Sequence, residues 1–124
     1  MKDVVPADLR DFILQHIDSV AHLEALILLR AYPQEEWNAA KVAKRLYINE
    51  QQASATLARL CEQGFLRRDE DSFRFENDVP ERRVMADRLA EVFGRHLIPV
   101  TNIIHSKPRR IREFADAFKF KKDR

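Results

Sequence analysis

The hydrophobic period of this chain changes at Gly64, and no other feature limits its possible folds as strongly. Before Gly64, apolar residues recur three or four positions apart, as on one face of an α-helix. After it, 65–68 and 72–75 follow an alternating pattern on either side of the acidic turn Asp69-Glu70-Asp71, which is typical of a β-hairpin. Helical spacing returns at Pro80. We therefore expect a mainly α-helical fold with one small hairpin.

Residues that commonly begin and end helices mark the expected boundaries. Small polar or acidic residues that suit a helix start precede three of the segments: Asp18 or Ser19, Asn38, and Asn49 or Glu50. Gly64 suits the left-handed position that closes a helix. Pro99 lies inside the long helical segment that begins at Pro80, and it should kink or break that segment nearby because proline lacks an N–H.

The length and composition fit a single domain with a helical extension. The chain has 124 residues, of which 45% are hydrophobic and 34% charged. We expect a folded domain over 1–79, which includes the N-terminal helices, and a C-terminal helical extension over 80–124. The chain has only two glycines, Gly64 and Gly94, which argues against a glycine-built phosphate loop.

The net charge of +2 hides a basic C-terminal tail. From Ile103 onward, eight basic residues stand against three acidic ones, so this part carries +5 and residues 1–102 carry −3. The lone Cys61 cannot form an internal disulfide, no apolar run is long enough to span a bilayer, and no segment resembles a secretion signal. We expect a cytoplasmic protein without integral membrane association.

The order of these elements between Trp37 and Asn77 resembles a winged helix-turn-helix. The expected helices 39–46 and 50–63 are similar to the two motif helices of MarR-like and ArsR-like bacterial regulators. The end of the second helix resembles theirs at Leu57, Leu60, Gly64 and the pair Phe65-Leu66. Four further segments resemble uncharacterised bacterial winged-helix proteins with a helical C-terminus: 17–20, 23–26, 106–108 and 114–118. The resemblance implies a winged helix with extended C-terminal helices.

The resemblance also implies that the second motif helix enters the major groove of duplex DNA. The residues expected to face the bases are Gln51, Gln52, Ser54 and Arg59. The residues expected to meet phosphates are Lys41, Lys44, Arg45, Arg67, Arg68 and Arg74. The alternative is that both sets only solvate the surface. The chain departs from many such regulators at Ala55, where they carry a basic residue, and at the acidic hairpin turn 69–71.

The C-terminal helices have more apolar surface than a small domain requires, so we expect a homodimer. The residues expected at its interface are Val92, Phe93, His96, Leu97, Val100 and Ile104. The alternative is that these side chains cover the chain's own core. The tail 107–124 has an apolar stripe and a cationic face, which suit a DNA backbone, an acidic protein partner or an anionic membrane surface.

No residue pattern indicates catalysis, a metal site or a cofactor. His16 and His22 are six positions apart and His96 and His105 nine apart, and neither spacing places both side chains on one helix face. We expect Cys61 to be a small buried hydrophobe, with redox sensing as its alternative. The main hypothesis is a DNA-binding regulator. The alternatives are a winged helix that docks on proteins and, more remotely, a membrane-surface adaptor.

Overall fold

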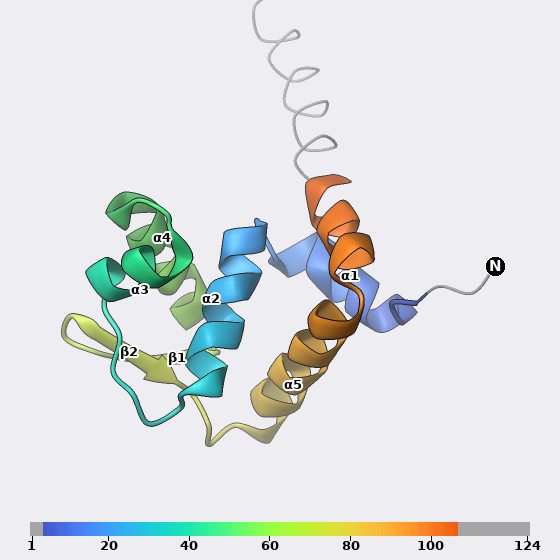
Figure 1. The fold of residues 1–124 in the computed structure, drawn as a ribbon. Helices are drawn as coiled ribbons and strands as arrows, with labels where there is room; N and C mark the ends of the chain where they lie inside the picture. Colours follow the sequence, from blue (N-terminus) through green and yellow to red (C-terminus); the bar gives the residue numbers. More distant parts are fainter. Residues whose placement is uncertain (1–3, 107–124) are drawn as a thin grey trace, which may run out of the picture.

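Helix α2 (Val20–Ala31) lies at the centre of the fold, and it contacts α3, α4, α5 and β2. The computed structural model describes residues 4–106 (Figure 1). The other elements are α1 (Ala7–His16), α3 (Ala39–Leu46), α4 (Glu50–Glu62), β1 (Leu66–Asp69), β2 (Ser72–Phe75), α5 (Pro80–Arg95) and a helix over 97–106. The fold is therefore mainly α-helical with one two-stranded antiparallel sheet, as expected.

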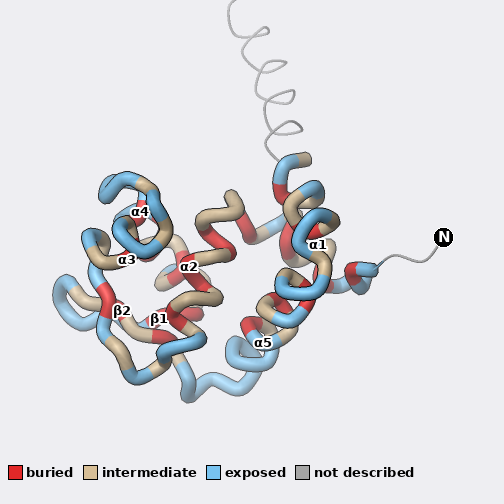
Figure 2. Tube along the Cα trace, in the orientation of Figure 1, coloured by how far each residue is buried: buried red, intermediate tan, exposed pale blue. Residues whose placement is uncertain are grey.

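The elements divide into two groups on opposite sides of α2. Helices α3 and α4 and the hairpin lie on one side, and α1, α5 and the helix over 97–106 lie on the other (Figure 1). Buried positions occur in α2 and in both groups beside it (Figure 2). Four side chains of α2 are fully buried between them: Leu23, Ala25, Leu26 and Leu29. Burial of such side chains is the main favourable contribution to folding.

The predicted helix boundaries are confirmed by side-chain capping. Ser19 Oγ accepts a hydrogen bond from His22 N–H at 3.1 Å, and Asn38 Oδ1 accepts one from Lys41 N–H at 2.8 Å. Asn49 Oδ1 does the same for Gln52 N–H at 2.6 Å. These three contacts begin α2, α3 and α4 in turn.

Gly64 ends the last turn after α4 and turns the chain into the hairpin. Its φ of +85° lies in the left-handed region, which glycine adopts without a Cβ penalty. The Gly64 N–H donates to Cys61 O and the Phe65 N–H donates to Leu60 O, both at 3.0 Å. These bonds satisfy carbonyls at the end of the helix. The prediction for this position is confirmed.

A backbone bridge at Trp37 joins the hairpin to the segment between α2 and α3, in addition to the packing of the strands on α2 and α4. The strands pair in the register Leu66 with Phe75 and Arg68 with Phe73. On the other edge of β2, the Trp37 N–H donates to Phe73 O at 2.8 Å, and the Phe73 N–H donates to Trp37 O at 2.6 Å. The Trp37 side chain is only 1% exposed, so this bridge joins the sheet to the core.

The expected break near Pro99 is confirmed, but it lies three residues earlier. Helix α5 ends at Arg95, and His96 leaves the helical conformation with φ −133° and ψ 57°. A second helix then runs over 97–106. Pro99 lies in its first turn, where an N–H has no intrahelical acceptor to lose. The proline therefore begins a helix and does not interrupt one.

Candidate functional site

The outward face of α4 brings together three of the four residues predicted to face bases. Gln51, Gln52 and Ser54 are exposed, as is Ala55. The opposite face is buried through Ala53, Thr56, Leu57 and Leu60. This helix therefore presents uncharged hydrogen-bonding groups to solvent. Glutamine amides can donate and accept at once, which suits them to read a base edge or a peptide group.

A buried polar network holds the C-terminal end of α4 against the junction of α1 and α2. The Asp18 N–H donates to His22 Nδ1 at 2.9 Å, and His22 Nε2 lies 3.0 Å from Gln63 Oε1. Because Nδ1 accepts, the ring proton lies on Nε2 and is donated to Gln63. Gln63 Nε2 in turn donates to His16 O at 2.6 Å. His22 is 1% exposed, so the imidazole at the centre of the network is shielded from water, whereas Asp18 at its edge is exposed.

Arg59 differs from the prediction, because its guanidinium is turned toward carboxylates. Its Nε lies 3.4 Å from Asp18 Oδ2 and its Nη1 lies 3.6 Å from Glu62 Oε1. Its charge is compensated at the end of α4 that packs near α2. The structure therefore does not bring Arg59 together with Gln51 and Gln52. The sequence could not show this, because Asp18 is 41 positions away.

Two of the six predicted phosphate-contacting cations are also in ion pairs. Lys41 pairs with Glu35, and its Nζ donates to Glu36 O at 2.9 Å. Arg67 Nε lies 3.5 Å from Glu76 Oε2, and its Nη1 lies 3.4 Å from Asp78 Oδ2. Both side chains are thus engaged next to the predicted surface. An exposed pair of this kind contributes little to stability, but it lowers the charge left for a ligand.

The other four cations form no ion pair with a carboxylate within residues 4–106: Lys44, Arg45, Arg68 and Arg74. Lys44 and Arg45 are exposed at the end of α3, and Arg45 lies over the Trp37 ring at 5.6 Å. Arg68 lies over the Phe73 ring at 5.3 Å. Arg74 pairs in register with Arg67 on the outer face of the hairpin. These four are the cations best placed to meet an anionic ligand.

A pocket of about 320 Å³ lies between the start of α3, the start of α4 and the hairpin. It is lined by Asn38, Ala39, Ala40, Glu50, Ser54, Arg68, Asp71 and Phe73. Its lining contains one cation, Arg68, and two carboxylates, Glu50 and Asp71. All three residues of the predicted acidic turn are exposed: Asp69, Glu70 and Asp71. The charge beside α4 is therefore mixed, with cations at the α3 end and anions at the hairpin tip.

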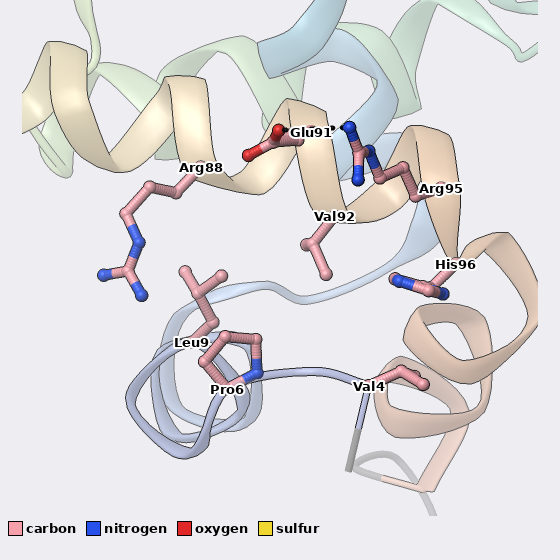
Figure 3. A pocket seen from close by; sticks show the side chains of 8 residues that line it. All are labelled: Val4, Pro6, Leu9, Arg88, Glu91, Val92, Arg95 and His96. Atoms are coloured by element: carbon pink, nitrogen blue, oxygen red, sulfur yellow. Dashed lines mark ion pairs between the residues drawn. The ribbon is translucent and has the colours of Figure 1, made fainter. Parts of the chain in front are cut away.

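A second pocket, of about 210 Å³, lies between the start of α1 and the end of α5 (Figure 3). Arg88 on its rim donates to both oxygens of Asp8, at 2.7 and 3.0 Å. This hydrogen bonding holds the pKa of the Asp8 carboxyl below its ordinary value and raises the pKa of Arg88. Arg95 lies 3.9 Å from Glu91. Both guanidinium groups already have carboxylate partners, so the pocket offers no unpaired arginine.

Half of the predicted dimer residues are buried within the chain itself, which corrects that assignment. Val92, Val100 and Ile104 are 7%, 0% and 1% exposed. Phe93 packs partly buried against the same core, and His96 is half-buried. The break at His96 lets the helix over 97–106 fold back on the core, which a continuous helix would not allow. Of the six, Leu97 is exposed, at 54%. The homodimer itself stays a prediction.

Little in the described part of the chain indicates other chemistry. Residues 4–106 hold no group of three His, Cys, Asp or Glu side chains placed to bind a metal ion, and no single helix among them is long and apolar enough to cross a membrane. Partial burial raises the pKa of the Cys61 thiol, which makes it less reactive. The basic tail 107–124 lies outside the described residues.

One exposed residue beside α4 was not predicted as functional. Tyr47 lies in the turn between α3 and α4, has a φ of 59° and is 94% exposed. The signal that could have identified it is an aromatic residue directly after a helix, where glycine or asparagine is usual.

Comparison of the chain with protein families, characterised proteins and solved structures found no match.

Proposed function

We propose that this chain is a winged-helix protein that binds duplex DNA and places α4 in the major groove. The observation that carries the proposal is the exposed face of α4, where Gln51, Gln52 and Ser54 are presented together. The hairpin follows α4 directly and would lie along the flanking backbone as the wing. Glutamine and serine side chains can hydrogen-bond base edges, and a helix fits the width of this groove.

The connectivity supports this assignment. The elements follow one another in the order of a winged helix. A helix comes first, then the extended residue Trp37, then two helices joined by a tight turn, and finally a hairpin. The bridge from Trp37 to Phe73 supplies the third strand position of such a sheet. Phosphate contacts would come from the four cations without carboxylate partners: Lys44, Arg45, Arg68 and Arg74.

A substitution on α4 tests the proposal. We expect the protein to bind a mixed-sequence duplex of about 30 base pairs at low salt, with an affinity that falls as salt rises. Gln52→Glu places a carboxylate against the DNA and should weaken binding about tenfold. The measurement is fluorescence anisotropy. Gln15→Glu is the matched control, because Gln15 is also exposed but lies on α1. Wild-type protein that does not bind at low salt would refute the proposal.

Protein docking is the second candidate, and the acidic hairpin tip favours it. Asp69, Glu70 and Asp71 are all exposed, and carboxylates at this point repel phosphates. In this alternative the tip meets a basic protein surface. The same titration separates the two candidates. If the hairpin lies on DNA, replacing Asp69 and Asp71 by Asn strengthens binding to the duplex. If it does not, the affinity for the duplex is unchanged.

A further inference from the structure

The left-handed conformation at position 47 closes α3, because the N–H groups of Tyr47 and Ile48 both donate to Ala43 O, but the fold does not explain why a tyrosine stands there. Tyr47 follows the last residue of α3 and has φ 59° and ψ 44°, with its N–H donating to Ala43 O. Non-glycine residues are disfavoured in this left-handed region, and a bulky side chain more than a small one. The residue is 94% exposed, so burial of its ring does not compensate. Glycine or asparagine would satisfy the backbone at lower cost.

The exposed residues nearest to Tyr47 in the sequence are cationic or hydrogen-bonding, whereas its direct neighbours Leu46 and Ile48 pack partly buried against the core. Lys44 and Arg45 precede it, both exposed and both without a carboxylate partner among the described residues. Asn49 follows and begins α4, whose exposed face starts at Gln51. Tyr47 therefore lies in the sequence between two cations that have no carboxylate partner among the described residues and the face proposed to enter the groove, although Arg45 also lies over the Trp37 and Tyr32 rings.

We infer that Tyr47 is a further DNA-contacting residue, whose hydroxyl donates a hydrogen bond to a phosphate oxygen of the duplex. This inference rests on the DNA-binding function proposed above. A tyrosine hydroxyl is a frequent donor to phosphate oxygens. Lys44 and Arg45 supply the charge that brings the phosphate to this turn, and the hydroxyl fixes its position. Tyr47 is then kept at a conformational cost to the free protein because it contributes to the complex.

Two substitutions of Tyr47 separate its role in binding from its effect on the fold. Tyr47→Phe removes only the hydroxyl and should weaken duplex binding several-fold, up to about tenfold. Tyr47→Gly removes the whole side chain and relieves the backbone, so it should weaken binding at least as much while its Tm equals or exceeds that of the wild type. The probes are a mixed-sequence duplex of about 30 base pairs at low salt, followed by anisotropy, and thermal unfolding by circular dichroism.

Tyr32→Phe is the matched control. Tyr32 is the other tyrosine of the chain, is 46% exposed and lies at the end of α2 beside Trp37. Arg45 lies over its ring at 5.7 Å, and phenylalanine keeps that ring, so the control removes a hydroxyl only. Removal of its hydroxyl should leave the affinity unchanged. If wild type and Tyr47→Phe bind the duplex equally, the role of Tyr47 is refuted while DNA binding stands. If the wild type does not bind, both are refuted. A Tm of Tyr47→Gly clearly below the wild type would show that the fold itself requires the tyrosine.

Discussion

The two sides of α2 use charged side chains in different ways. On the side of α1 and α5, arginines join separate elements: Arg88 of α5 binds Asp8 of α1, and Arg30 of α2 lies 2.7 Å from Asp87 of α5. In the last turn of α3, Lys44 and Arg45 have no such carboxylate partner among the described residues. A cation that already holds two helices together is a poor ligand for another molecule. The contrast is confined to Lys44 and Arg45, since Lys41, Arg59 and Arg67 on the same side of α2 are also paired with carboxylates. It supports the proposal that a ligand meets the end of α3.

The largest effect is expected where the two sides meet, at His22. His22→Leu removes the acceptor of the Asp18 N–H and the donor to Gln63 in a buried place. Loss of these bonds should lower the free energy of unfolding by about 2–4 kcal/mol. Urea denaturation followed by circular dichroism measures this. His105→Gln is the control, because His105 is exposed and its replacement should change stability little. Equal stability of His22→Leu and wild type would show that the network does not hold α4 in place.

The two glycines should respond in opposite directions to the same substitution. A residue with a side chain at position 64 would have to keep the positive φ of Gly64. Its Cβ would also lie 2.9 Å from Arg82 Nε, which donates a hydrogen bond to Gln63 O. Gly64→Ala should therefore cost about 1–2 kcal/mol. Gly94 lies within α5, and a Cβ there meets nothing within 4 Å among the described atoms.

Gly94→Ala should accordingly stabilise the protein by about 0.5–1 kcal/mol, because alanine favours the helix. Thermal unfolding of both variants beside the wild type makes the comparison. A loss of stability in Gly94→Ala would mean that the α5 surface at this position is covered by something other than solvent. That result would weaken the contrast between the two sides.

The smallest effect is expected at the exposed pair of Asp8 and Arg88. Arg88 lowers the pKa of Asp8 below its ordinary value of 3.8, so the charged carboxylate stabilises the folded state at pH values above that value. Asp8→Asn should unfold at a slightly lower temperature than wild type near pH 7. As the pH falls below 3.8 through the lower folded-state pKa, Asp8 takes up a proton and the difference should vanish. Melting curves across this range test it, and a difference that persists at the acid end would contradict the assignment.

Local signals in the sequence were sufficient for the elements of this fold. The expected caps were Asp18 or Ser19, Asn38, and Asn49 or Glu50, and the structure assigns Ser19, Asn38 and Asn49. Such caps can be predicted because each needs only a backbone N–H three residues ahead. Gly64 was equally readable from its place after a helical segment. The alternation behind it was enough to predict the hairpin.

Contacts between distant residues could not be predicted in this way. Nothing near Arg59 in the sequence indicates its pair with Asp18, and nothing near Trp37 indicates its bridge to Phe73. The apolar spacing of Val100 and Ile104 is the same whether they face a second copy or their own core. The break at His96 distinguishes the two possibilities, because it lets the helix over 97–106 pack against the core of its own chain.

The bridge at Trp37 has a consequence for how this protein behaves at high concentration. A short sheet with a free edge invites strands of neighbouring molecules to add to it, which leads to aggregation. Here the Phe73 backbone groups on the open side of β2 are already bonded to Trp37. The opposite edge, β1, carries Arg67, Arg68 and Asp69, all exposed. One edge is thus blocked and the other is charged, which keeps a two-stranded ribbon from becoming a template for intermolecular pairing.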